Sequence, residues 1–430
     1  MTNPHHNGPD AWSGSRHPHE QPTGRGDVTA RGDAPARRSL PSGSYGGAGT
    51  SAGTGSHTGD GVPAAAPAAG ASASPPVPQD WAPPGRPASA ATAPARVPRM
   101  IWGEDRTGLH LLAVWTERVP GRGEDAEPLN VYHQESRRGL IGVFDGSGGS
   151  GSSPAWQAPD GEQRTGAWVG ARVAHLATDC WFQEIIADDG PADADRLKGF
   201  LDFFHERAPQ RRSKIVGRMR RQLPTTLAAV AYRLGSNEQL EGTALWAGDS
   251  RAYLLSPDAG LQVLTRDHTE ESDALELLRS DPPMTNTVCA DREFFVQEQN
   301  LEFPMPCVLL AATDGFFGYV HTPADFEDTL LSTLLRANNA TEWADLIRRD
   351  VQAYTADDAS LTLVAVGHED FTALRTAFEE RAGQISAFCS KDRPTRADQA
   401  TTVRTWQDRT WHDYRTDYAA YLPAAQEEQA

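Results

Sequence analysis

The chain has 430 residues, of which 38% are apolar and 23% are charged, and its formal net charge is −18. The first hundred residues hold 15 glycines and 16 prolines but only three aromatic residues. Such a composition buries too little apolar surface to offset the ~1–2 kcal/mol per residue that backbone ordering costs. We therefore expect a disordered Ala/Gly/Pro/Ser-rich tail over residues 1–98, followed by a folded body.

The body is strongly acidic. Residues 101–430 carry 52 acidic and 32 basic residues, a net charge of −20. This balance disfavours nucleic acid and anionic membranes as partners. No apolar run is long enough to span a bilayer, and no signal peptide is visible. The four cysteines are far apart and form no Cys-x-x-Cys motif, so we expect a protein of the reducing cytoplasm.

Apolar periodicity predicts runs of strands with helices inserted between them. Strands are expected at His110–Trp115 and Gly139–Phe144, followed by helical regions at about Thr165–Ile186 and Asp193–Arg221. The later expected elements are strands at Thr225–Arg233, Gln239–Ala247, Ala252–Ser256, Leu261–Leu264, Glu293–Gln297, Pro306–Thr313 and Ser360–Val366, and helices at Pro323–Arg336 and Thr341–Tyr354. This order is typical of an α+β fold rather than of a regular parallel sheet.

After Gly367 the chain is predicted to be helical again, over about Asp370–Phe388 and Thr401–Tyr421. The last helix spaces its aromatic residues three and four positions apart, as a stripe on one face: Trp411, Tyr414, Tyr418 and Tyr421. Packing of this stripe onto the body is the favoured interpretation, and a partner-binding helix is the alternative. We predict a main domain over residues 100–367 and a helical extension over residues 368–430.

Four short segments place acidic residues beside turns at the ends of predicted strands: Glu124-Asp125, Asp145-Gly146, Asp314-Gly315 and Asp357-Asp358. One Asp-Gly after a strand is usually only a turn. Several at one rim of a sheet would gather carboxylates that cannot all ionise unless a cation neutralises them. Oxygen ligands without nearby His or Cys suit Mg²⁺ or Mn²⁺.

The order of these segments resembles that of the PPM/PP2C family of metal-dependent protein Ser/Thr phosphatases. The matching elements occur in the family's order over about residues 120–366: Glu124-Asp125, Asp145-Gly146-Ser147, Pro224-Thr225-Thr226, Gly248-Asp249-Ser250-Arg251, Thr265-Arg266-Asp267-His268, Thr313-Asp314-Gly315-Phe316 and Asp357-Asp358-Ala359-Ser360. The resemblance implies a β-sandwich of two antiparallel sheets flanked by helices. It also implies hydrolysis of phosphoserine and phosphothreonine in the protein targets of Ser/Thr kinases.

The same resemblance implies a metal site with Mn²⁺ or Mg²⁺ as cofactor. In this scheme Asp145 bridges two ions, and the carbonyl group of Gly146 binds one of them. Asp314 and Asp357 bind the first ion. Asp145 and Asp314 are the predicted catalytic residues.

Three further acids are implied to assist. Glu124, together with Asp125, supports the second ion largely through water. Asp249 matches a position that helps a third, weaker ion in bacterial members of the family. Two ions, with a third at Asp249, are therefore expected.

The chain also departs from the family pattern. Members usually have a phosphate-binding Arg about four residues before the Glu of the first segment, where this chain has Pro120. Arg118 and Arg122 flank that position, and we expect Arg122 to bind phosphate. Asp358 replaces the family's Asn, so a shift of one residue would make Asp358 the ligand instead of Asp357.

Two other functions fit parts of the sequence. Gly146–Gly151 fits a Gly-x-Gly-x-x-Gly pattern after a strand, but Asp145 would then place a carboxylate against the pyrophosphate of a dinucleotide. The more serious alternative is a PP2C-fold module that binds phosphoproteins or partners and is catalytically dead or slow. The acids Asp145, Asp314 and Asp357 favour an enzyme, whereas the displaced Arg favours the binding module.

Overall fold

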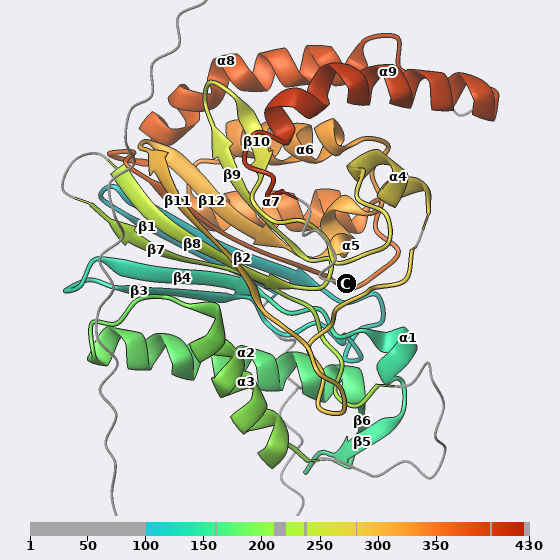
Figure 1. Cartoon of the computed structure of the whole chain (residues 1–430). Helices are drawn as coiled ribbons and strands as arrows, with labels where there is room; N and C mark the ends of the chain where they lie inside the picture. Colours follow the sequence, from blue (N-terminus) through green and yellow to red (C-terminus); the bar gives the residue numbers. More distant parts are fainter. Residues whose placement is uncertain are drawn as a thin grey trace, which may run out of the picture. The chain divides into compact units, whose positions relative to one another are not determined.

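The computed structural model (Figure 1) describes residues 100–159, 161–209, 221–235, 239–280, 282–395 and 398–424. The tail predicted over residues 1–98 lies outside this part of the chain, as does the end of the second predicted helical region. Within these ranges, no helix combines the length and the apolar character needed to cross a lipid bilayer.

Two antiparallel sheets form the centre of the body. Neighbouring strands of the six-stranded sheet follow the order β1 (Ile101–Arg106), β2 (Leu109–Thr116), β13 (Ala359–Val366), β12 (Cys307–Ala312), β9 (Arg251–Ser256) and β10 (Gly260–Val263). In β13 and β12 every residue is buried. Such continuous burial shows that both faces of this sheet are covered, which explains why its central strands read as unbroken apolar runs.

The five-stranded sheet has the order β11 (Gln297–Pro304), β8 (Gln239–Ala247), β7 (Leu227–Leu234), β4 (Arg138–Val143) and β3 (Leu129–His133). A separate two-stranded hairpin pairs β5 (Pro154–Gln157) with β6 (Gln163–Thr165). The hairpin lies in the connection between β4 and the first long helix.

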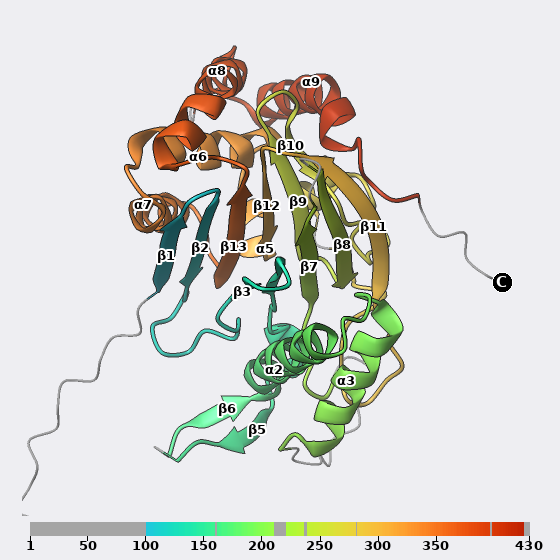
Figure 2. The same cartoon turned by 90° about the vertical axis from the view of Figure 1, so that its left-hand side faces the viewer.

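Helices cover the outer face of each sheet (Figure 2). On the five-stranded sheet lie α2 (Gly166–Ala187) and α3 (Ala194–Arg207). On the other side lie α6 (Pro323–Arg336), α7 (Ala340–Gln352), α8 (Phe371–Ser390) and α9 (Ala400–Tyr418). Three short helices complete the described elements: α1 (Gly148–Gly151), α4 (Ala274–Arg279) and α5 (Asp314–Phe317).

The three largest clusters of buried apolar side chains lie between the sheets and under each of the two helical layers. Between the sheets, Leu111, Leu309 and Val364 of the larger sheet meet Ile141 and Val230 of the smaller one. The layers therefore run helix, sheet, sheet, helix. The α+β fold predicted from the sequence, two stacked antiparallel sheets flanked by helices, is confirmed.

Local sequence signals explain where several elements begin. Helix α6 begins at the predicted residue because Pro323 occupies its first turn and Thr322 forms a capping box with Asp325. The strand expected at Glu293–Gln297 is wrong, since β11 runs over Gln297–Pro304 instead. Its alternate polar side chains face solvent on an edge strand, so the segment lacked the apolar run that predicts a strand.

The aromatic stripe of the last helix packs on the body. Trp411, Tyr414 and Tyr418 are buried in the cluster beneath α6 and α8. Tyr421 follows the helix, and its ring lies edge-on to that of Phe303, with the centroids 5.7 Å apart. Most of this aromatic face is therefore covered by the rest of the protein.

Candidate metal centre

Four acidic residues next to strand ends lie at one end of the two sheets. Asp145 lies two residues after β4, and Asp249 lies two residues after β8. Asp314 begins α5 after the end of β12, and Asp357 lies two residues before β13. Strands β4 and β7 contact β12 across the sandwich, and the small cluster of Val143, Ala228 and Ala311 joins the sheets beneath these turns.

Asp145 is fixed through its backbone. Its carbonyl oxygen accepts hydrogen bonds from the amide of Thr226 at 2.8 Å and from the hydroxyl of Thr225 at 2.7 Å. The Thr226 hydroxyl in turn makes a 2.6 Å hydrogen bond with Ser250. The two threonines of the Pro224-Thr225-Thr226 element thus hold the turn that carries Asp145.

The carboxyl groups of this centre oppose one another's ionisation. Burial raises the pKa of Asp145 well above its usual range, and the negative charges of Asp125, Asp249 and Asp357 raise it further. The pKa of Asp314 is raised in the same way, first by burial and then by Asp145, Asp249 and Asp357. Such a cluster is stable only with bound protons or a compensating cation.

Asp125 belongs to the same cluster and is the most enclosed of its acids. The residue is buried, and its Oδ2 accepts a 3.1 Å hydrogen bond from the hydroxyl of Thr313, next to Asp314. Burial, followed by the nearby charge of Asp358, raises the pKa of Asp125 to about 8. The structure therefore brings Asp125 together with Asp145 and Asp314.

Glu124 lies in the loop between β2 and β3, and its side chain reaches the start of α2. Its Oε1 accepts a 2.5 Å hydrogen bond from Thr165, whose hydroxyl oxygen also caps the helix by accepting from the amide of Trp168 at 3.1 Å. Burial is the main cause that raises the Glu124 pKa, and the charges of Asp358 and Asp357 add to it. Glu124 therefore has its carboxylate held at the rim of the acidic cluster.

Arg172 holds the loop that carries Glu124 and Asp125, a role that the sequence analysis missed. Its guanidinium donates to the carbonyl oxygen of Glu124 at 3.1 Å and to that of Asp125 at 2.9 Å. It also lies 4.0 Å from the centre of the Trp168 ring. Burial lowers the pKa of Arg172 to about 10. The only sequence signal was its position one helical turn after Trp168.

Glycines allow the acidic turns to approach one another closely. A Cβ atom at Gly146 would lie 2.7 Å from the carbonyl oxygen of Glu124. At Gly315 it would overlap the carbonyl oxygen of Asp358. The Asp-Gly pairs are therefore explained by close backbone packing as well as by turn geometry.

Arginine side chains flank the cluster. Arg122 lines a pocket of about 500 Å³ together with Glu124, Arg164 and Trp168. Arg118 is exposed, and its positive charge counteracts the raised pKa of both Glu124 and Tyr319. Neither guanidinium makes a hydrogen bond or an ion pair with any residue in the described ranges. Both groups are therefore available to an anion.

The donor atoms fit a hard divalent cation. Carboxylate and carbonyl oxygens are the ligands of Mg²⁺ and Mn²⁺, which commonly keep several waters. No three Asp, Glu, His or Cys side chains in the described ranges close around one point as a ready-made metal cage. The described acids therefore offer oxygen ligands of the kind that Mg²⁺ and Mn²⁺ use.

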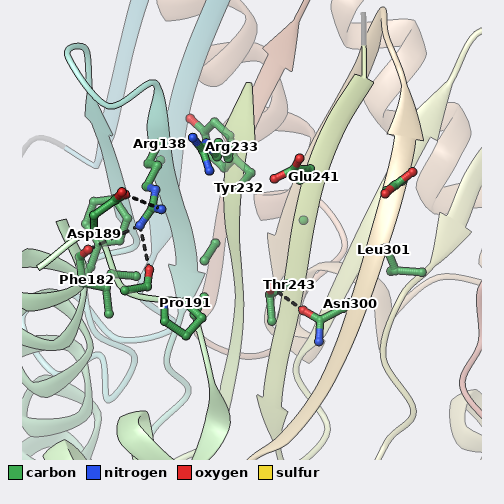
Figure 3. Close-up of a pocket in the computed structure, with 17 residues that line it drawn as sticks. Arg138, Phe182, Asp189, Pro191, Tyr232, Arg233, Glu241, Thr243, Asn300 and Leu301 are labelled. Carbon is green, nitrogen blue, oxygen red and sulfur yellow. Dashed lines mark hydrogen bonds and ion pairs between the residues drawn. The ribbon is translucent and has the colours of Figure 1, made fainter. Parts of the chain in front are cut away.

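A larger hollow lies at the opposite end of the five-stranded sheet (Figure 3). It measures about 780 Å³, and none of the predicted site residues lines it. Four charged residues lie side by side on neighbouring strands at this hollow, each paired with the next: Arg138, Arg233, Glu241 and Glu302. Because none of the four acidic segments reaches this hollow, it is a less suitable place for the predicted chemistry.

Comparison with known proteins gives matches to solved structures only. No family model matches the chain, and no curated protein matches it either. One similar structure is PppA, described as a key regulatory component of T6SS in Pseudomonas aeruginosa, with 20% identity and a TM-score of 0.39. The match covers 61% of this chain and 98% of that chain.

Two further similar structures are Ser/Thr phosphatases. PstP/Ppp of Mycobacterium tuberculosis is 16% identical, with a TM-score of 0.40 over 60% of this chain and 99% of that one. The catalytic domain of the Ser/Thr protein phosphatase PstP in complex with two manganese ions is 16% identical, with a TM-score of 0.39 over 60% of this chain and 98% of that one. The chain is thus similar in structure to these two solved Ser/Thr phosphatases.

Proposed function

We propose that the chain is a metal-dependent protein phosphatase that hydrolyses phosphoserine and phosphothreonine. The observation that carries this proposal is the convergence of Asp145, Asp314 and Asp357 at one end of the sandwich. Their negative charges repel one another and raise the pKa of Asp145 and of Asp314. The proposed substrates are proteins phosphorylated by Ser/Thr kinases, and the proposed location is the cytoplasm.

The residues would hold two Mn²⁺ or Mg²⁺ ions. Asp145 and the Gly146 carbonyl, with Asp314 and Asp357, are the proposed direct ligands, and Glu124 acts through water. When bound, such ions lower the pKa of a shared water and neutralise phosphoryl oxygens. Their positive charge also relieves the repulsion that raises the carboxyl pKa values in the protein alone.

The remaining predicted residues have supporting roles. Asp125 adds negative charge beneath the same centre, and Asp249 is the proposed ligand of a third, weaker ion. Arg122 is the proposed phosphate ligand because its guanidinium lies in the pocket beside Glu124. A planar guanidinium can pair with two phosphoryl oxygens at once.

A phosphoprotein-binding module without activity is the second candidate. It is favoured by Pro120, which stands where the family usually has its phosphate-binding Arg. A module of this kind would still bind phosphopeptide through Arg118 or Arg122. It would release no phosphate.

The two candidates are separated by assaying the full chain on a phosphothreonine peptide and on para-nitrophenyl phosphate, with Mn²⁺ or with EDTA. We expect Mn²⁺-dependent release of phosphate from both substrates and none with EDTA. Asp145→Asn should remove the activity, whereas Asp258→Asn, in the exposed turn between β9 and β10, should not. Peptide binding without hydrolysis would favour the binding module, and full activity in EDTA would contradict a metal-dependent enzyme.

A further inference from the structure

A second pocket lies between α9 and the body, beside β9, β10 and α4. Its volume is about 300 Å³, within the range of small-ligand sites. Its walls are mainly apolar and include Val263, Leu277, Trp411, Tyr418 and Leu422. No predicted metal or phosphate ligand lines it. The pocket is therefore distinct from the candidate metal centre.

The carboxylates that line this pocket are already engaged. Asp267 accepts two hydrogen bonds from the guanidinium of Arg251, at 2.9 and 2.8 Å. Asp273 accepts the indole N–H of Trp411 at 2.9 Å through Oδ2, and its Oδ1 accepts from the amides that open α4. Both acids are thus satisfied by the protein.

Of the three arginines that line the pocket, Arg251 pairs with Asp267, but the other two are not neutralised in this way. Arg266 donates from Nε to the carbonyl oxygen of Pro423 at 2.9 Å, and Arg415 lies exposed on α9. Neither forms an ion pair with any residue that the structure describes. A body with a net charge of −20 therefore has an apolar pocket whose uncompensated charge is positive.

We propose that this pocket binds a compact amphipathic anion, such as a small aromatic carboxylic acid. The apolar part would pack against Trp411 and Leu277, and the carboxylate would pair with Arg415 and Arg266. Apolar walls with a few fixed polar groups are typical of sites for small organic ligands. This proposal does not depend on phosphatase activity.

The occupant would touch a residue that also supports the metal-ligand turn. Arg251 lines the pocket, and its guanidinium lies 4.3 Å from the centre of the Phe317 ring. Phe317 ends the short helix α5, which begins with Asp314. Arg251 and Phe317 therefore connect the pocket to the turn that carries Asp314.

The test is a titration of the full chain with 3-phenylpropionate, followed by ligand-observed NMR and by the shift in melting temperature. The neutral control is 3-phenylpropanol, which has a similar shape and no charge. We expect 3-phenylpropionate to bind with a Kd on the order of 1 mM, as is usual for a ligand of this size. The alcohol should bind about threefold to fivefold more weakly, the difference expected of a partly exposed ion pair.

Two variants locate the site. Arg415→Gln should weaken 3-phenylpropionate binding to the level of the alcohol, whereas Arg404→Gln, on the same helix but outside the pocket, should have no effect. Ala419→Leu should fill the pocket and reduce the binding of both probes. Equal binding of acid and alcohol, no effect of Arg415→Gln, or no binding of either probe at ~10 mM would overturn the proposal.

Discussion

Asp358 holds the backbone of Glu124 in place. Its Oδ2 accepts a hydrogen bond from the amide of Glu124 at 2.7 Å, and its Oδ1 accepts one from the amide of Arg118 at 2.7 Å. The carboxylate thus joins the loop after β2 to the turn before β13. Asp357 is engaged differently, since its oxygens accept from the hydroxyl of Tyr319 and from the amide of Asp358.

This difference predicts distinct effects for the two neighbouring acids. Asp357→Asn should lower kcat on the order of a hundredfold with little change in stability, because it removes a proposed metal ligand. Asp358→Asn should cost about 1–3 kcal/mol of unfolding free energy, since one amide donor loses its acceptor. Denaturant unfolding and turnover, measured on both variants, test this. The reverse pattern would make Asp358 the ligand and shift the alignment by one residue.

The two flanking arginines are predicted to contribute unequally to phosphate binding. Arg122→Ala should raise KM more than Arg118→Ala, because Arg122 lines the pocket that contains Glu124. The comparison needs a phosphopeptide substrate at saturating Mn²⁺. A larger effect from Arg118 would place the phosphate nearer to Tyr319, the other side chain that its charge influences. Negligible effects from both would favour the binding module.

Arg172→Lys is predicted to lower stability and the affinity for Mn²⁺, although Arg172 is not a proposed ligand of metal or phosphate. A lysine amine cannot reproduce the fork that contacts the carbonyl oxygens of Glu124 and Asp125. We expect a loss of about 1–3 kcal/mol in unfolding free energy and a weaker apparent affinity for Mn²⁺. Arg404→Lys, an exposed change on α9, is the matched control. Unchanged stability would show that these hydrogen bonds do not hold the loop.

The C-terminal helices are tied to the body by one buried carboxylate. Glu327 of α6 is fully buried and accepts two hydrogen bonds from Arg381 of α8, at 2.6 and 3.0 Å. The same group accepts from the hydroxyl of Tyr414 at 2.5 Å and from the amide of Leu261 at 3.1 Å. Four donors on three different elements therefore depend on this side chain.

Truncations at the two ends of the chain are predicted to have opposite effects on stability. A protein ending at Gly367 would lose Arg381 and Tyr414, and the apolar side chains of α6 that pack against α8 and α9 would be exposed to water. We expect it to be insoluble or largely unfolded. Deletion of residues 1–95 should leave the melting temperature nearly unchanged, because that composition forms no core. A stable, active chain ending at Gly367 would show that the extension is dispensable.

The sequence was most informative where periodicity and strand ends coincide. The helix expected at Pro323–Arg336 and the strand expected at Gln239–Ala247 have the bounds that the structure shows. Asp145 and Asp314 follow buried strands, so the sandwich topology brings them to one end. Apolar patterning and turn chemistry were sufficient for these elements.

Other features depend on contacts between distant residues. Arg172 contacts two carbonyl oxygens almost fifty positions away, and Asp358 accepts from amides more than two hundred positions away. No local pattern encodes such hydrogen bonds. The polar edge strand β11 was missed for a related reason, since it is defined by its pairing with β8 rather than by its own composition.

Isothermal titration of Mn²⁺ into the full chain and into its Asp145→Asn variant tests the proposed metal centre most directly. We predict two ions bound to the unaltered chain and a loss of at least tenfold in affinity in the variant, because the proposed ligand Asp145 loses its charge. Equal stability of the two proteins in denaturant would confirm that folding is intact. Identical Mn²⁺ binding by both proteins, or no binding by either, would contradict a metal centre built on Asp145.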